Sequence, residues 1–291
     1  MINYQPINTL LQRANKNVDQ RFIDGFLEDD RKDARILEDI LGKRMTKMLF
    51  SDSPKERAEA YQYLIIGIKE FDFTQIGRKK SQETYVALFS VIDKGTFEDD
   101  QKVIQSAVDL LVNLIDLHGR QFVGKLEEEE MEDELQDHSM SIIDNLLIKL
   151  GNENIRMQQD AFIGLNKLSH FQVTNYKKQI DRIVGGKKTK KKEIIQGKLR
   201  HLRQLIDHHK IDNTKYEKPQ VITEYILKYV DHGDKDIQED AYLALLKYYE
   251  QVGPKINKHL IRMTPASAQL FSEAQQIHQE EGFAVAKRYI S

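Results

Sequence analysis

A small residue followed by apolar residues four and seven positions later recurs along the chain, and this pattern limits the fold more than any other feature of the sequence. The first residues of the five copies are Ala60, Ala107, Ala161, Leu199 and Ala241. The fourth copy departs from the pattern, because it begins with leucine and has Arg203 where an apolar residue is expected. Their spacings of 47, 54, 38 and 42 residues are close to the roughly 40 to 47 residues of stacked helix pairs.

Each copy is preceded by another apolar segment with helical spacing. These segments read ILEDILGKRMTKMLF, ETYVALFSVID, HSMSIIDNLLIKL, TNYKKQIDRIV and QVITEYILKYV. Each hairpin must bury its apolar face against its neighbours, because it cannot bury that face alone. The sequence therefore predicts an all-α fold, a right-handed α-solenoid of five to six HEAT-like or armadillo-like helical hairpins over residues 37–262.

Proline positions agree with a helical array. The 291 residues include five prolines and fifteen glycines, and proline is tolerated in the first turn of a helix, where the N–H that it lacks would have no partner. Glu56 stands three residues after Ser53, which predicts a capping box, and Thr264 is expected to cap a further helix. The helix starts expected at prolines are Pro54, Pro219, Pro254 and Pro265.

Two terminal segments lie outside the predicted array. Residues 1–36 are expected to be partly irregular, and their apolar side chains could cap the first repeat. Residues 263–291 are expected to form a helix and a tail, which either covers the last repeat or docks a partner. The apolar residues concerned are Leu10, Leu11, Phe22 and Phe26 in the first segment, and Phe283, Val285 and Tyr289 in the second.

An acidic run interrupts the repeat. Seven of the eight residues 127–134 are acidic, and like charges at this density repel one another. We therefore predict an inserted acidic connector over about residues 125–137, which explains the long second spacing. The run lacks the glycine and the alternating oxygen ligands of a calcium-binding loop.

In each of the five predicted repeats, one short turn separates the two helices. These turns are SDSPKER (51–57), GTFEDDQK (95–102), GNENIR (151–156), GGKKTKKKE (185–193) and HGDKDI (232–237). In stacked hairpins such turns lie along one edge. Their basic and amide side chains are Lys55, Arg57, Lys102, Asn152, Asn154, Arg156, Lys187, Lys188, Lys190, Lys191, Lys192 and Lys235. The pattern predicts a cationic edge that binds an acidic protein surface, with an affinity that falls as salt screens the charges. Ordinary solvated turn residues are the alternative interpretation.

The sequence resembles TOG domains, which are HEAT-type arrays that bind tubulin heterodimers through the turns inside their repeats. The likeness covers about residues 40–262 and is strongest to the TOG domain of the large centrosomal and ciliary-tip proteins that also carry a jelly-roll module, a coiled coil and zinc fingers. The segments that carry it are KMLFSDSPKERAEAYQYL, LGNENIRMQQDAFIGL, KKEIIQGKLRHLRQLI and YVDHGDKDIQEDAYLALLKYYEQVGPKINKHL.

The resemblance implies a non-catalytic domain that binds tubulin or the microtubule lattice, in a cilium, flagellum, centriole or basal body, together with other ciliary-tip or axonemal proteins. It implies edge contacts by Asn152, Asn154, Arg156, Asp234 and Lys235. TOG domains usually present an aromatic residue, often tryptophan, in the first turn. Here Pro54 follows Ser53 at that place, the chain has no tryptophan, and Phe97 is the aromatic residue of the second turn.

Other classes of function lack their sequence signals. The 44 basic and 46 acidic side chains give a net charge of −2, which is not the charge of a typical nucleic-acid-binding domain. The absence of cysteine excludes thiolate metal sites and disulfides and fits a reducing compartment. We expect a cytoplasmic, monomeric domain without a cofactor, a metal or a membrane segment.

The sequence disfavours a phosphate-binding loop and a metal site. GGKKTKKK departs from the phosphate-loop motif, since a lysine stands where serine or threonine is required. A metal site at His201, Asp207, His208 and His209 is disfavoured, because neighbouring histidines on a helix point about 100° apart; a solvated helix end is expected instead. A HEAT-like DNA glycosylase remains a weaker alternative, as does a scaffold for another protein. Most of Tyr61, Tyr63, Tyr242, Tyr248 and Tyr249 are expected to pack in the core.

Overall fold

The computed structural model describes residues 28–122, 125–126, 128–186, 189–211 and 219–290. Within these ranges the secondary structure is helical and contains no β-strand, so the predicted all-α fold is confirmed. The chain divides into two units. The first comprises the residues up to Leu146 together with Asn154–Thr174, and the second comprises Leu147–Glu153 and the residues from Asn175 onward.

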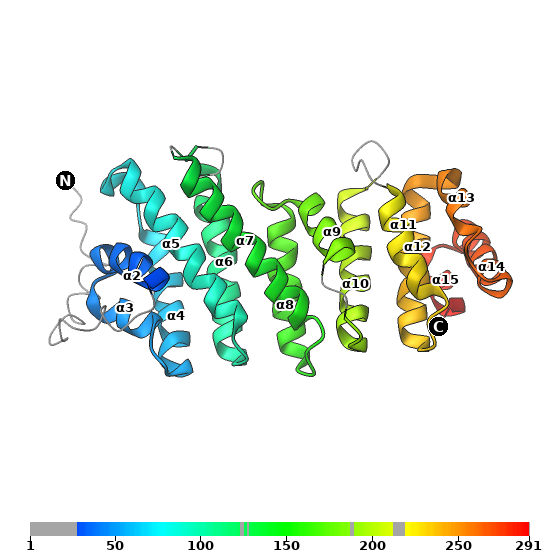
Figure 1. Cartoon of the computed structure of the whole chain (residues 1–291), viewed down its shortest axis with the longest axis horizontal. Coiled ribbons are helices and arrows are strands. Elements are labelled where there is room, and N and C mark those ends of the chain that lie inside the picture. The colour runs from blue at the N-terminus through cyan, green and yellow to red at the C-terminus, as the bar shows by residue number, and fades with distance from the viewer. Residues whose placement is uncertain (1–27, 123–124, 127, 187–188, 212–218, 291) are drawn as a thin grey trace. The chain divides into compact units, whose positions relative to one another are not determined.

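The first unit contains three helical hairpins (Figure 1). The second helices of these hairpins pack in a row, α4 against α6 and α6 against α8, while α2 packs on α5. A short 3-10 helix, η2, follows α4. The bounds are α2 Glu28–Leu41, α3 Lys43–Leu49, α4 Pro54–Glu70, η2 Phe73–Ile76, α5 Arg78–Phe97, α6 Gln101–Phe122, α7 Glu129–Lys149 and α8 Ile155–Ser169.

The small residues of the repeat pattern allow these helices to approach closely. Ala60, Ala107 and Ala161 are completely buried. The same contact needs Gly95 near the end of α5, because a Cβ atom there would lie 2.5 Å from the Tyr61 hydroxyl oxygen and 2.7 Å from the Ala107 Cβ. The predicted repeat positions therefore form the core of the unit.

The second unit continues the repeat with two further hairpins and ends in a third helix pair. Within it α10 packs on α12, α9 packs on α11, and Leu199 and Ala241 are completely buried. The bounds are α9 Tyr176–Gly185, α10 Lys192–His209, α11 Pro219–Val230, α12 Lys235–Val252, η3 Gly253–Ile256, α13 Asn257–Leu260, α14 Pro265–Glu281 and α15 Phe283–Ile290. The five predicted hairpins are thus present.

Both termini of the array differ from the prediction. Helix α2 begins at Glu28 rather than near residue 37, because Ala34 and Leu37 give this charged segment an apolar stripe that is buried. Gly42, with φ 80°, separates α2 from α3. At the other end the expected tail is helix α15, which packs on α14. Leu10, Leu11, Phe22 and Phe26 lie outside the described residues.

The acidic segment is a helix start, not a connector. Helix α7 begins at Glu129, and Met131 and Leu135 are buried on its inner face. Carboxylates are stabilised near a helix N-terminus by the helix dipole. Lysines of neighbouring helices also reduce the repulsion: Lys32 pairs with Glu134, and the Lys79 Nζ lies 2.9 Å from Glu128 Oε1.

Most of the tyrosines singled out in the sequence lie in the core. Tyr61, Tyr242 and Tyr248 are buried, Tyr249 is half-buried, and Tyr63 is exposed. Among the described residues, no helix combines the length and the apolar character needed to cross a membrane.

An aromatic cluster fills the core of the first unit. The rings of Tyr85 and Phe122 stack with centroids 4.5 Å apart, and Phe73 meets Phe122 edge to face at 5.1 Å. The Tyr85 hydroxyl is buried without a hydrogen-bond partner, whereas the Tyr61 hydroxyl donates to the Val91 carbonyl oxygen at 2.7 Å.

We expect opposite effects when these two hydroxyls are removed. Tyr85→Phe removes an unsatisfied polar group and should leave the free energy of unfolding unchanged or raise it by about 1 kcal/mol. Tyr61→Phe removes a buried hydrogen bond and should lower that free energy by about 1 kcal/mol. Urea unfolding of both variants checks this contrast, and a loss in Tyr85→Phe equal to that in Tyr61→Phe would contradict it.

Candidate partner-binding turns

All five turns expected from the sequence lie between the first and second helix of a hairpin. The described non-helical residues of these links are 50 to 53, 98 to 100, 150 to 154, 186 with 189 to 191, and 231 to 234. Lys187 and Lys188, two of the predicted contact residues, lie outside the described residues. Phe97 belongs to the last turn of α5, so the second link is shorter than the sequence suggested.

The first turn is joined to the second by Arg57. Its guanidinium donates to the Ser51 carbonyl oxygen and pairs with Glu98, which follows α5. The Arg57 side chain is only 16% exposed. Arg57 was predicted as an edge contact, but the structure gives it a role in holding two turns together.

The predicted capping box at the start of α4 is wrong. The Ser53 side chain makes no capping hydrogen bond. Ser51 takes its place: its hydroxyl oxygen accepts from the Ser53 N–H at 3.1 Å, and its O–H donates to Glu56 Oε2 at 2.5 Å. The capping-box spacing fits Ser53 and not Ser51, which stands five residues before Glu56, so the spacing gave the wrong serine.

The helices that follow the second and third turns are capped by polar side chains. Asp100 Oδ1 accepts from the N–H groups of Lys102 and Val103 at 2.9 and 3.1 Å, and Asn154 Oδ1 accepts from the Arg156 N–H at 3.0 Å. Burial raises the pKa of Asp160 on α8, whose Oδ2 atom is buried without a hydrogen-bond partner. Helix α6 packs against α8 as it does against α4.

Two large apolar side chains project from these turns in the first unit. Phe97 is 74% exposed and Ile155 is 69% exposed. Lys55, Lys102 and Arg156 are exposed cations of the same turns. Ile155 is not among the contacts predicted from the sequence, although a signal existed: Ile155 precedes the buried Met157 by two residues, which places it on the other side of α8.

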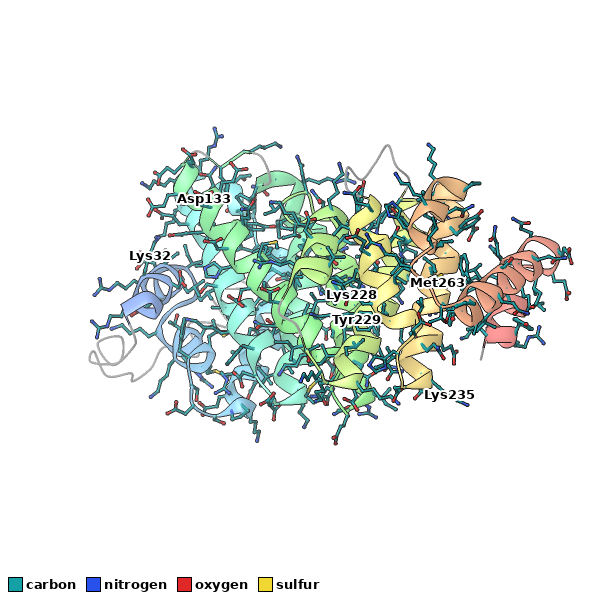
Figure 2. The ribbon with its side chains drawn as sticks, turned by 45° about the vertical axis from the view of Figure 1, so that its right-hand side comes forward. Lys32, Asp133, Lys228, Tyr229, Lys235 and Met263 are labelled. Atoms are coloured by element: carbon teal, nitrogen blue, oxygen red, sulfur yellow. The ribbon has the colours of Figure 1, made fainter. Side chains whose placement is uncertain are left out.

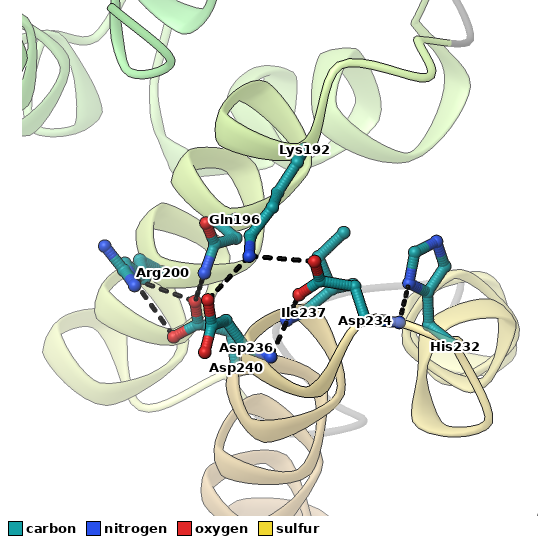
Figure 3. A network of polar contacts seen from close by, with 8 residues as sticks. All are labelled: Lys192, Gln196, Arg200, His232, Asp234, Asp236, Ile237 and Asp240. Carbon is teal, nitrogen blue, oxygen red and sulfur yellow. Dashed lines mark hydrogen bonds and ion pairs between the residues drawn. The ribbon is translucent and has the colours of Figure 1, made fainter. Parts of the chain in front are cut away.

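The fourth and fifth turns are joined by a polar network within the second unit (Figure 3). The Lys192 Nζ lies 2.8 Å from Asp234 Oδ2 and 2.6 Å from Asp236 Oδ2. Asp234 also caps α12, since its Oδ1 accepts from the N–H groups of Asp236 and Ile237. The hydrogen bond from Lys192 lowers the pKa of Asp234. Lys192 and Asp234, both predicted as partner contacts, stabilise the turns.

The network continues along the contact of α10 with α12. Arg200 Nε donates to both carboxylate oxygens of Asp240, at 3.1 and 2.9 Å, and Gln196 donates to Asp240 at 3.3 Å. Arg203, which the repeat pattern expected to be apolar, is half-buried on the same helix. Burial lowers the pKa of its guanidinium.

Exposed cations remain at these two turns. Lys190 and Lys191 precede α10, and Lys235 begins α12, where its side chain extends from the helix end (Figure 2). Residues 150–153 lie beside the start of α10 in the same unit, because a Cβ atom on Gly151 would be 2.5 Å from the Ile194 backbone nitrogen. Asn152 is half-exposed in this segment.

The sequence matches neither a protein-family model nor a curated protein. Solved structures do match. The TOG domain of human Cep104 has a TM-score of 0.66 at 17% identity, with 90% of this chain and 97% of that chain covered. The TOG domain of Zyg9 from C. elegans has a TM-score of 0.61 at 15% identity, with 84% and 85% covered.

The chain has the fold of a TOG domain. The N-terminal domain of MAST/Orbit is also similar, with a TM-score of 0.61 at 13% identity over 82% of this chain and 97% of that chain. The TOG-type solenoid implied by the sequence resemblance is therefore confirmed. At sequence identities of 13 to 17%, these similarities show the fold alone. They do not identify which residues of this chain contact a partner.

His201, which was expected to lie in a solvated helix end with Asp207, His208 and His209, is buried in the structure. His201 is 1% exposed, and its Nε2–H donates a hydrogen bond to the Gln179 side-chain oxygen at 2.7 Å. It is therefore a core residue and not part of a solvated helix end. No group of three or more metal-ligating side chains occurs in the described residues.

Burial makes His201 a determinant of acid stability. It lowers the pKa of His201 to about 4 in the folded chain, against about 6.5 in the unfolded chain. Below pH 6.5 the unfolded state binds a proton that the folded state rejects, so folding stability falls as the pH drops toward 4. At pH 5 the loss should be about 2 kcal/mol relative to pH 7.

Urea unfolding at pH 7 and pH 5 measures this loss. His201→Gln cannot titrate and should lose about 2 kcal/mol less than the wild type over this interval. His208→Gln, at an exposed position of the same helix, should keep the full wild-type loss. Equal pH dependence in His201→Gln and the wild type would contradict the assignment.

The structural role of Arg57 can be separated from that of its exposed neighbour. Arg57→Met leaves the half-buried Glu98 and the Ser51 carbonyl oxygen without their donor, and should lower the free energy of unfolding by about 2 kcal/mol. Lys55→Met, two residues earlier on the exposed side of α4, should change it by less than about 0.5 kcal/mol. Similar urea midpoints for the two variants would show that Arg57 does not hold the turn.

Proposed function

We propose that this chain is a non-catalytic domain that binds tubulin through the turns at the starts of its second helices. The observation that carries the proposal is the pairing of exposed apolar and cationic side chains on those turns in a TOG fold: Phe97 and Ile155 stand among Lys55, Lys102 and Arg156. Protein interfaces combine such apolar contacts with charge complementarity.

Similar structures support the choice of partner. One comes from work on the specificity with which TOG domains bind tubulin. It has a TM-score of 0.65 at 12% identity, with 93% of this chain and 94% of that chain covered. Another comes from work on crescerin, described as using a TOG array to regulate microtubules in the primary cilium. We extend tubulin binding to this chain by analogy of fold, together with the character of its turns.

The structure refines which side chains we propose as contacts. In the first unit these are Pro54, Lys55, Phe97, Lys102, Ile155 and Arg156, with Ser53 beside them. In the second unit they are Asn152, Lys190, Lys191 and Lys235, and we retain Lys187 and Lys188 from the sequence. Arg57, Asn154, Lys192 and Asp234 act indirectly, because their pairings and caps hold the turns in place.

We further propose that the domain acts as a monomer in the cytoplasm, on microtubules of a cilium, flagellum, centriole or basal body. The likeness to the TOG domain of human Cep104 and to the crescerin domain supports this setting. Other ciliary-tip or axonemal proteins are partners in the same proposal. Membranes, nucleic acids and cofactors have no part in it.

A scaffold that binds a different acidic protein is the second candidate. Pro54 favours it, because the first turn lacks the aromatic residue that TOG domains usually place against tubulin. The two candidates share the same turns and differ in the partner, so a direct measurement of tubulin binding separates them.

Charge reversal on the turns should weaken binding to tubulin. We expect Arg156→Glu and Lys191→Glu each to raise the dissociation constant at least tenfold at low salt, because each places a carboxylate opposite an acidic partner. Phe97→Ala should have an effect of similar size through lost apolar area. Co-elution with tubulin in size-exclusion chromatography and co-sedimentation with microtubules measure the binding.

Matched controls make this test specific. Arg120→Glu, near the end of α6, and Lys255→Glu, after α12, change the same charge at exposed positions away from the turns. They should bind within about twofold of the wild type. Unchanged affinity in both turn variants would eliminate the turns as the binding surface, and absence of wild-type binding would favour the scaffold.

A further inference from the structure

Two hydroxyl residues in the chain directly precede a proline: Ser53 before Pro54, and Thr264 before Pro265. This dipeptide is the basic recognition element of proline-directed protein kinases. Both pairs occupy the same kind of place, the residue before a helix and the first residue of that helix, α4 and α14. Position at a helix start therefore does not distinguish them, but the surroundings of the two hydroxyls do.

The Thr264 hydroxyl is occupied. Its oxygen accepts from the Ser267 N–H at 3.3 Å, and its O–H donates to Asp231 Oδ1 at 2.9 Å. The Ser267 hydroxyl donates to the same carboxylate. Transfer of a phosphoryl group to Thr264 would break the helix cap and set a dianion beside Asp231, which like-charge repulsion disfavours.

The Ser53 hydroxyl is available. It makes no capping hydrogen bond, because the Ser51 hydroxyl orders the turn instead. Ser53 has an extended backbone, with φ −80° and ψ 114°, and Pro54 and Lys55 after it are exposed. Phosphorylation of the Ser53 hydroxyl therefore breaks no helix cap.

We propose that Ser53 is a phosphorylation site for a proline-directed kinase and that the phosphate regulates the first turn. In the reaction the Ser53 Oγ attacks the γ-phosphorus of ATP. The Oγ–P bond forms while the bond from the γ-phosphorus to the bridging oxygen breaks, ADP leaves, and the hydroxyl proton passes to a base of the kinase. The regulatory part rests on the proposed function of the turns.

The phosphate changes the charge where the proposed contacts begin. A phosphoserine carries about −1.5 to −2 charges near neutral pH, and Lys55 and Arg57 follow within four residues. Arg57 now pairs with Glu98, and a phosphate on Ser53 competes with that carboxylate for the guanidinium. The first turn would then repel an acidic partner, and its link to the second turn would weaken.

The first arm of the test maps the phosphate without tubulin. The full chain is incubated with ATP and a purified kinase of the mitogen-activated class, and the products are read by peptide mass spectrometry. We expect Ser53 to be modified at least tenfold faster than Thr264, and Pro54→Ala to slow the modification of Ser53 at least tenfold. Equal rates at the two sites, no phosphate on Ser53, or no effect of Pro54→Ala would overturn the site.

The second arm measures the consequence. Chain phosphorylated at Ser53 should bind tubulin at least tenfold more weakly than unmodified chain, and kinase treatment should leave the affinity of Ser53→Ala equal to that of the untreated Ser53→Ala variant. Equal binding of the modified and unmodified chains would overturn the regulation. If the unmodified chain does not bind tubulin, the proposed function fails and the regulation with it, while the mapping still decides the site by itself.

Discussion

Close packing of successive second helices is the interaction on which the rest of the structure depends. In the first unit α4, α6 and α8 pack in a row, and the completely buried Ala60, Ala107 and Ala161 lie in this layer. A methyl side chain leaves room for the neighbouring helix and has no polar atom that needs a partner. Because the helices pack in register, their starts come next to each other, and so do the turns that precede them.

Polar contacts between consecutive turns divide the cations of the turns into two groups. One group pairs with carboxylates of the chain itself, and the other is exposed to a partner. Arg57 pairs with Glu98 in the first unit, and Lys192 pairs with Asp234 and Asp236 in the second. A cation that is held by carboxylates of its own chain contributes little attraction to a partner. The positive charge that each unit presents is therefore smaller than a count of lysines and arginines suggests, and it resides on residues such as Lys102 and Arg156.

Much of this fold follows from the sequence, because the repeat pattern reports buried positions directly. The five anchors, the helix pairs and the places of the turns were all predictable from spacing. Features that depend on residues far apart in the sequence but close in space were not predictable in this way. The acidic start of α7 is helical because Met131 and Leu135 are buried and Lys32 and Lys79 lie opposite its carboxylates. Likewise, no local pattern reveals that His201 is in the core or that Arg57 faces Glu98.

The first turn shows how a departure from the family pattern changes the proposed interface. Proline offers less contact area than an aromatic ring, so Pro54 shifts the apolar contribution toward Phe97 and Ile155 in the second and third turns. In the proposed interface the first turn then contributes mainly electrostatic contacts, through Lys55. Electrostatic contacts respond strongly to one added phosphate, whereas a packed ring would respond mainly to changes in shape. In the proposed interface Pro54 both limits the apolar contribution of the first turn and completes the Ser53-Pro54 dipeptide, so one residue connects the weak apolar contact with the proposed control by charge.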